Sequence, residues 1–222
     1  MPRESLKAKQ ERAVACIKLL KQHYPKAQTS LTHKSVYQLL VATILSAQCT
    51  DERVNIVTPS LFKKYPSIKA FADADLKELA QDIFTTGFFN SKAKSIKESA
   101  RQILERHGGK VPKTLDELVK LQGVGRKTAS VVLGAGYGLA EGIVVDTHVG
   151  RISRLLGFTS AKDPVKVEQD LMKIIPHNDW IIYSHLLIFH GRAVCKARKP
   201  DCASCILNRL CPFGQGQLIK KP

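Results

Sequence analysis

Apolar residues recur at the spacing of an α-helix along most of this chain, and that periodicity limits its fold more than any other feature. In a first expected helix, Ala13, Ile17 and Leu20 fall on one face, and Pro25 ends it. Residues 36–47 are apolar at most positions, which favours a central buried helix, although a short buried strand gives the same pattern. Strand-like alternation is almost absent elsewhere. The sequence therefore predicts an all-α fold.

Glycine-containing segments mark where several helices end. Gly108 and Gly109 follow a helix as its C-cap, and a capping box at 114–117 begins a short one. Three glycines within 134–138 predict a loose break, where we place the crossing between two lobes. At 86–90 two phenylalanines follow a glycine. Burial of both is the ordinary outcome, whereas exposure of one would offer it to a ligand.

The charge balance is unusual, with 35 Lys and Arg against 19 Asp and Glu and a formal net charge of +16. Such a charge favours a polyanionic partner, above all nucleic acid, over a basic protein with no such partner. No secretory signal or membrane-spanning run is apparent. We therefore expect no membrane contact and a cytoplasmic, reducing compartment, in which the six cysteines are thiols or metal ligands before disulfides.

Residues 121–129 place a glycine turn, formed by Gly123, Val124 and Gly125, between two helical segments. Glycines let the backbone approach a ligand closely, and the first N–H groups of the second helix are left unpaired. The turn is therefore either an anion site, as helix N-termini provide, or a tight helix corner without a ligand. On a chain this basic we favour phosphate binding.

Two charged residues lie at the starts of expected helices. Lys127 is in the first turn after the glycines, where a cation is unfavourable with the helix dipole. Such a lysine serves as a phosphate-binding or solvated residue, or as a nucleophile, and taken alone it favours the first. Asp146 has the position of an N-cap. A carboxylate held there can also stabilise positive charge or accept a proton.

Four cysteines crowd one segment near the C-terminus: Cys195, Cys202, Cys205 and Cys211. Thiols at this density in a reducing compartment indicate a metal. The paired knuckles of a zinc ribbon are absent, so the spacing favours a cubane iron–sulfur cluster, although the ligand type also suits zinc. Basic residues between the first two cysteines form a candidate phosphate clamp: Lys196, Arg198 and Lys199.

These motifs occur together in one known family. The chain resembles the endonuclease III family of DNA glycosylases with associated AP lyase activity, in the helix-hairpin-helix superfamily. The resemblance covers nearly the whole chain and rests on the cysteine spacing and on residues 46–48, 87–93, 121–129 and 145–148. The conjunction of the hairpin, Val-Asp-Thr-His and the cysteine loop is highly specific.

The resemblance implies an all-α fold in two lobes with a DNA groove between them. A six-helix barrel with the helix-hairpin-helix motif would span residues 28–138. Residues 1–27 and 139–222 would form a helical iron–sulfur cluster domain, with a 4Fe–4S cluster that is not regarded as the hydrolytic catalyst. A monomer is sufficient for such a groove.

The resemblance also implies roles for single residues. Lys127 corresponds to the nucleophile and Asp146 to the catalytic carboxylate. Gln48, Phe88 and His148 match positions that fill the gap or touch the strands once a nucleotide is flipped out. The implied function is that of a bifunctional DNA glycosylase/AP lyase of base excision repair, at the nucleoid of a prokaryote. It would remove oxidised pyrimidines from double-stranded DNA by Schiff-base chemistry and cleave abasic sites by β-elimination.

Two residues depart from the family pattern. Gln122 replaces the proline that usually precedes the hairpin glycine, which predicts a somewhat looser turn. Phe88 replaces a leucine, which alters stacking against bases and leaves the lesion and opposite-base preference open.

Two other functions fit part of the pattern. One is a mismatch glycosylase of the same superfamily, acting on adenine or on mispaired thymine or uracil. Lys127 argues against it, because those relatives typically lack that lysine. The other is a noncatalytic iron–sulfur protein that binds DNA.

Overall fold

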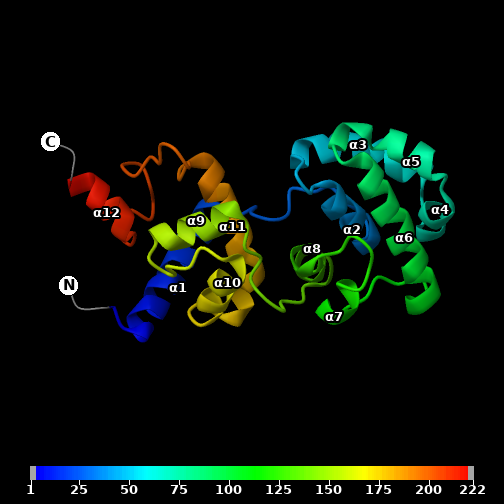
Figure 1. Cartoon of the computed structure of the whole chain (residues 1–222). Helices are drawn as coiled ribbons and strands as arrows, with labels where there is room; N and C mark the ends of the chain where they lie inside the picture. Colours follow the sequence, from blue (N-terminus) through cyan, green and yellow to red (C-terminus); the bar gives the residue numbers. More distant parts are fainter. Residues whose placement is uncertain (1–3, 220–222) are drawn as a thin grey trace. The chain divides into compact units, whose positions relative to one another are not determined.

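The computed structural model describes residues 4–219, in which helices and turns account for the regular structure and no β-strand occurs (Figure 1). The prediction of an all-α fold is confirmed. The chain divides into two compact units, one formed by residues 29–141 and the other by residues 1–28 together with 142–222. Among the described residues, no helix combines the length and the apolarity that a membrane crossing requires.

The unit of residues 29–141 is built around helix α2 (Val36–Leu45), whose residues 39–42 are fully buried. Helices α3 (Asp51–Lys64), α6 (Phe89–His107) and α8 (Arg126–Val131) pack against it. Burial on all sides explains why the α2 sequence is apolar at almost every position. The segment is a helix, so the alternative of a short buried strand is excluded.

The remaining elements of this unit are short. Helices α4 (Ile68–Asp73) and α5 (Leu76–Asp82) pack along α6, a 3-10 turn covers Phe84–Thr86, and α7 (Leu115–Leu118) precedes α8. Helix α6 is amphipathic, with one buried stripe: Lys92, Ala93, Ser95, Ile96, Ser99, Ala100 and Ile103. It ends at Gly108 in the left-handed conformation, as the C-cap prediction required.

The glycine segment 134–138 is not a loose break, and that prediction is wrong. Helix α8 continues directly into one turn of π-helix, Val132–Tyr137. A Cβ atom on Gly136 would lie 2.9 Å from Val36 Cγ1, so glycine is needed for this turn to pack closely on α2. Close packing on α2 therefore explains Gly136, which in the sequence alone indicates only flexibility.

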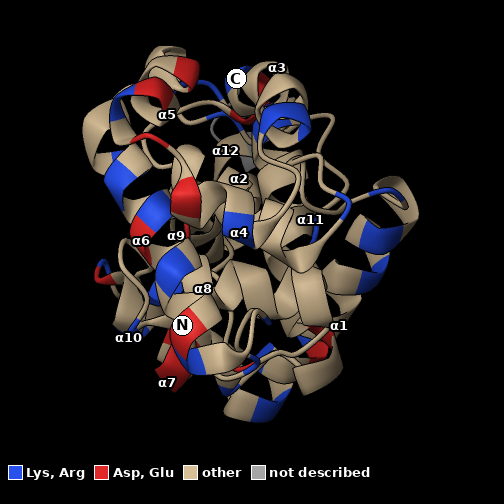
Figure 2. Cartoon of the chain, turned by 90° about the vertical axis from the view of Figure 1, so that its right-hand side faces the viewer, with Lys and Arg blue, Asp and Glu red and all other residues tan. Residues whose placement is uncertain are grey.

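The second unit contains six helical elements in the described residues: α1 (Leu6–His23), α9 (Thr147–Leu155), α10 (Pro164–Met172), η3 (His177–Asp179), α11 (Trp180–Ala193) and α12 (Pro212–Ile219). Helix α11 packs against both α1 and α9. Cys16 lies in this core, and burial raises the pKa of its thiol to about 12, so it stays a neutral packing group. Lys and Arg, blue in Figure 2, are distributed over many helices of both units.

Candidate functional site

The two glycines of the hairpin between α7 and α8 have different surroundings. Gly123 has a φ of 76°, and a Cβ atom there would lie 2.4 Å from Ser95 on α6. Gly125 is the N-cap of α8 with a φ of −85°, and nothing lies within 4 Å of the position a Cβ atom would take. Val124, between them, is buried. The fold itself thus requires glycine at 123, whereas Gly125 leaves the backbone open to a ligand.

Gln122 shows what replaces the expected proline. Its backbone N–H donates to Gln102 Oε1 on α6, at 2.8 Å. Proline has no N–H and could not form this bond. The turn is therefore anchored to α6 by a hydrogen bond, where a proline would stiffen it through its ring.

Lys127 lies in the first turn of α8, as predicted, and its side chain is exposed. Within residues 29–141 its Nζ atom has no hydrogen-bond or ion-pair partner. No side chain caps the start of α8 either. An amine that no partner holds is available to a substrate that approaches the open backbone at Gly125.

Gln48 and Phe88 share an unusual backbone conformation. Among residues 4–219 they are the only non-glycine residues with positive φ, at 53° and 48°. Such conformations cost about 1–3 kcal/mol each and gather at functional sites. Phe88 is 66% exposed, whereas its neighbour Phe89 packs against the core. Of the two outcomes considered for these aromatics, the exposure of one is therefore confirmed.

In the other unit, Asp146 is the N-cap of α9, as predicted. Its Oδ1 atom accepts a hydrogen bond from Val149 N at 2.8 Å, and the side chain is partly buried. This bond fixes the carboxylate at the helix start. His148 packs against Gly191 of α11, where a Cβ atom would lie 2.6 Å from His148 Nδ1. That nitrogen is buried and has no hydrogen-bond partner in the described residues.

The four cysteines of the C-terminal segment line one small cavity. No three His, Cys, Asp or Glu side chains in the described part of the chain gather closely enough to bind one metal ion. Four thiols that line one cavity suit the ligand set of a cubane iron–sulfur cluster, and the same ligand type also suits zinc.

Side chains and backbone groups contact the cysteine sulfurs directly. Arg151 donates to Cys195 through Nη1 to Sγ (3.7 Å) and through Nη2 to the carbonyl oxygen (2.7 Å). His190 Nε2 lies 3.5 Å from Cys205 Sγ, and burial lowers the pKa of this imidazole to about 4. Burial also raises the pKa of Cys205 to about 11, so a metal group is what would hold it as a thiolate.

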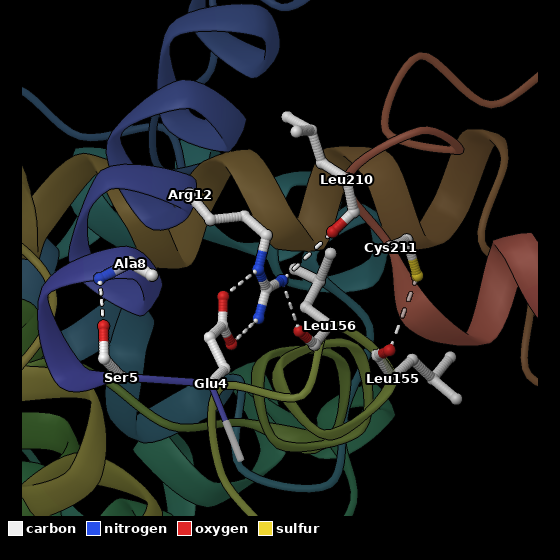
Figure 3. Close-up of polar contacts among 8 residues, drawn as sticks. All are labelled: Glu4, Ser5, Ala8, Arg12, Leu155, Leu156, Leu210 and Cys211. Atoms are coloured by element: carbon white, nitrogen blue, oxygen red, sulfur yellow. Dashed lines mark hydrogen bonds and ion pairs between the residues drawn. The ribbon is translucent and has the colours of Figure 1, made fainter. Parts of the chain in front are cut away.

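Arg12 of α1 links the start of the chain to the cysteine segment (Figure 3). Its Nη1 atom donates to the carbonyl oxygens of Leu156 at 2.6 Å and Leu210 at 3.0 Å, and its Nε and Nη2 atoms bind the two carboxylate oxygens of Glu4. Leu210 directly precedes Cys211. The guanidinium of Arg12 holds the pKa of Glu4 below its ordinary value.

The candidate phosphate clamp is exposed: Lys196, Arg198 and Lys199.

Sequence reasoning missed three residues that support these sites: Arg12, Arg151 and Lys92. Lys92 is 5% exposed on α6. Its only sequence signal is that a lysine falls in phase with the apolar stripe that continues at Ile96 and Ile103. The partners of the two arginines lie far away in the chain, and no local pattern points to them.

Comparison with known proteins places the chain in a family. Residues 41–177 match the HhH-GPD superfamily base excision DNA repair protein. Endonuclease III of Synechocystis sp. is 52% identical over 208 residues, 94% of this chain and 95% of that protein. Endonuclease III of Bacillus subtilis is 47% identical, over 90% of this chain and 91% of that protein.

Solved structures give the same result. A trapped endonuclease III–DNA covalent intermediate has a TM-score of 0.87 at 42% identity, covering 94% of this chain and 98% of its own. A thermostable thymine-DNA glycosylase, at 21% identity and a TM-score of 0.84, shares the fold. The chain therefore belongs to the endonuclease III family, within the HhH-GPD superfamily of base excision DNA repair proteins.

Proposed function

We propose that Lys127 is the nucleophile and Asp146 the catalytic carboxylate of this enzyme. As a member of the endonuclease III family, the chain is a bifunctional base excision repair enzyme, a DNA N-glycosylase and AP lyase. The observation that carries the assignment is the exposed Lys127 amine, which has no partner in its unit and follows the open backbone of Gly125. Asp146 supports it, because a backbone bond to one oxygen holds the carboxylate in place.

The reaction begins with a damaged nucleotide extruded from the duplex, at a cost of a few kcal/mol that weakened pairs lessen. The neutral amine of Lys127 attacks the sugar C1′ atom, and the N-glycosidic bond breaks. The base leaves with the bonding electron pair and takes up a proton. Asp146 stabilises the positive charge that develops on the sugar and accepts the proton released by the lysine nitrogen.

The lyase step follows on the same covalent adduct. The sugar ring opens to a Schiff base between Lys127 and C1′, which acidifies the protons on C2′. Loss of one of these protons breaks the C3′–O bond, so the strand is cut 3′ to the lesion. Water then hydrolyses the Schiff base and frees the lysine. An abasic site has already lost its base, so it forms the Schiff base with Lys127 without cleavage of an N-glycosidic bond.

We infer that double-stranded DNA with oxidised or ring-saturated pyrimidines, or with abasic sites, is the substrate. Structures of endonuclease III with DNA are among the solved neighbours. Gly123, Val124 and Gly125 would hold the backbone, while Gln48, Phe88 and His148 would occupy or border the gap left by the extruded nucleotide. The exposed clamp would bind phosphates: Lys196, Arg198 and Lys199. The enzyme would act as a monomer in the prokaryotic cytoplasm, at the nucleoid.

We also propose that a 4Fe–4S cluster is held by the four cysteines that line the cavity: Cys195, Cys202, Cys205 and Cys211. When bound, it supplies a cross-link for the C-terminal segment, and no step of base removal passes through it. Arg151 would contact Cys195, and His190 would contact Cys205.

We propose two lobes. Residues 28–138 form the lobe that contains the hairpin, and residues 1–27 together with 139–222 form the lobe that contains the cluster.

The test of the catalytic assignment is borohydride trapping on a duplex that contains thymine glycol. We expect wild type to nick the strand and to form a covalent adduct, and Lys127→Ala to do neither. Asp146→Asn should slow base removal by about 10²–10⁴-fold. Lys120→Ala, which removes another exposed lysine from the same hairpin, is the matched control and should trap as wild type does.

The outcomes separate the rival functions. Trapping by Lys127→Ala at the wild-type level would refute the proposed nucleophile. Failure of wild type to act on thymine glycol, with release of adenine, thymine or uracil from a mismatched duplex without nicking, would indicate a monofunctional mismatch glycosylase. Tight binding of the duplex with neither reaction would indicate a noncatalytic DNA-binding protein.

A further inference from the structure

Lys92 is a buried lysine whose charge no carboxylate balances within its unit. It is 5% exposed, in the apolar stripe of α6. Its Nζ atom donates to two backbone carbonyl oxygens, those of Leu45 at 2.8 Å and Thr86 at 2.7 Å. Burial lowers the pKa of this amine. A charge kept in such a place needs a reason beyond packing, because an apolar side chain of similar volume is often as stable or more so.

The two carbonyls belong to the ends of two helical elements. Leu45 is the last residue of α2, and Thr86 is the last residue of the 3-10 turn. Carbonyl groups at the C-terminal end of a helix lack intrahelical partners and carry partial negative charge. A single ammonium group with three donors can therefore serve both ends at once.

Each of these ends is followed within three positions by one of the two left-handed residues. Gln48 follows Leu45 by three positions, and Phe88 follows Thr86 by two. The bond to Leu45 spans 47 positions in the chain, so it joins turns that the sequence keeps far apart. Lys92 lies one helical turn after Phe88, and its backbone N–H donates to the carbonyl oxygen of Phe88 at 3.0 Å. The two strained turns thus share one buried cation as their common anchor.

We propose that Lys92 is a positioning residue that locks the turns of Gln48 and Phe88 to each other, so that both side chains enter the DNA stack as one rigid wedge. Insertion of the wedge into DNA rests on the proposed function, whereas the lock between the two turns does not. A rigid wedge matters because misplacement by about 1 Å can cost 10²-fold in rate. Strained backbone also persists only where surrounding contacts determine it, and the two Lys92 bonds are such contacts.

The chain contains a matched control on the same helix. Lys97 of α6 also donates from Nζ to a carbonyl oxygen at a helix end, that of Ala74, at 2.7 Å. It is partly buried, and its Nζ atom bonds neither Leu45 nor Thr86. Lys92→Met and Lys97→Met therefore remove the same charge from the same helix, and only the first removes the anchor of the turns.

Amide hydrogen exchange on the full chain tests the lock without reference to activity. In Lys92→Met the amides of residues 46–49 and 86–89 should exchange at least about tenfold faster than in wild type, whereas Lys97→Met should leave them unchanged. Lys92→Gln, which keeps an uncharged amide group with two donors, replaces Lys92→Met if that variant does not fold. Unchanged exchange in the turns would overturn the proposal. Loss of fold in both variants would assign Lys92 to the core and overturn it as well.

A double-mutant cycle with Phe88→Ala tests whether Lys92 acts through the wedge. We expect Lys92→Met to slow single-turnover removal of thymine glycol by about tenfold, and the double variant to be little slower than Phe88→Ala alone. Affinity for undamaged duplex, which phosphate contacts dominate, should change less than about threefold. Rate losses that multiply would show independent roles and overturn the proposal. If wild type lacks the reaction, the proposed function fails, and the exchange experiment still decides the lock.

Discussion

The wedge turns at 46–48 and 86–88 and the cysteine segment 195–211 are both irregular backbone, and they are held in different ways. The wedge turns follow helical ends, and two hydrogen bonds from the buried Lys92 hold these ends, whereas Gln48 and Phe88 themselves are exposed. In the cysteine segment only Leu207 is buried, although Ile206, Leu210 and three of the cysteines pack against the core, and Arg12 and Arg151 bond carbonyl oxygens of the segment. The first region is held by one buried cation of its own unit, whereas we propose that the second depends on a bound group.

If this contrast is right, the largest effect should follow removal of the proposed cluster. Cys205→Ser should contain no iron or sulfide, where wild type contains about four of each per chain. The amides of residues 191–219 should also lose their protection from hydrogen exchange. The helices of residues 29–141 should keep theirs. Cys49→Ser, at a partly buried cysteine of the other unit, is the control and should retain iron. Stoichiometric zinc in wild type would refute the cluster.

Substitution of the two hairpin glycines should lower the free energy of unfolding by unequal amounts. Gly123→Ala forces positive φ on alanine and pushes its Cβ atom into Ser95, so we expect a loss of roughly 3 kcal/mol or more in the free energy of unfolding. Gly125→Ala meets open space at negative φ and should cost about 1 kcal/mol or less. Denaturant unfolding measures both. Equal losses would mean that packing does not distinguish the two glycines.

Arg12 supports the other unit through charge and hydrogen bonds. Arg12→Met leaves the carbonyls of Leu156 and Leu210 without this donor and should lower the free energy of unfolding by about 2 kcal/mol. Arg101→Met, which removes an exposed surface ion pair with Glu98, should cost less than about 1 kcal/mol. Similar costs for the two variants would show that Arg12 adds only a surface ion pair.

The same contact predicts a pH dependence. The Arg12 guanidinium lowers the pKa of Glu4 in the folded protein, so the ionised carboxylate stabilises the fold above the ordinary pKa of 4.5, and this contribution disappears as the pH falls through the lowered value. Wild type should therefore lose more stability than Arg12→Met on acidification below about pH 4.5. Parallel stability curves for the two proteins would contradict this assignment.

The smallest effect should come from the anchor of the hairpin. Gln102→Ala removes the acceptor of the Gln122 N–H and should cost about 1 kcal/mol in thermal or denaturant unfolding. In a Gln122→Pro background, which has no N–H to lose, the same substitution should cost close to nothing. An equal cost in both backgrounds would show that Gln102 stabilises α6 in some other way.

Much of the fold was predictable because its signals are local. Helix periodicity and caps act within one or two turns, so the N-cap at Asp146 and the C-cap at Gly108 were correctly read. The identity and spacing of the four cysteines indicate a bound metal group, which stays a proposal. The chemistry of Lys127 and Asp146 rests on the resemblance to a family, and their roles stay predictions.

Only the tertiary structure decided how the turns are held and which side chains face outward. Phe88 and Phe89 are identical neighbours, and only packing against the core shows that Phe88 is the exposed one. The glycines at 134–138 read as a break, whereas Gly134 and Gly136 lie in a π-helix turn and Gly136 packs closely on α2. The phase of Lys92 with the apolar stripe of α6 hints at burial, but its proposed role depends on a carbonyl 47 positions away. Contacts of that range leave no periodic trace in a sequence, because they depend on where whole helices pack.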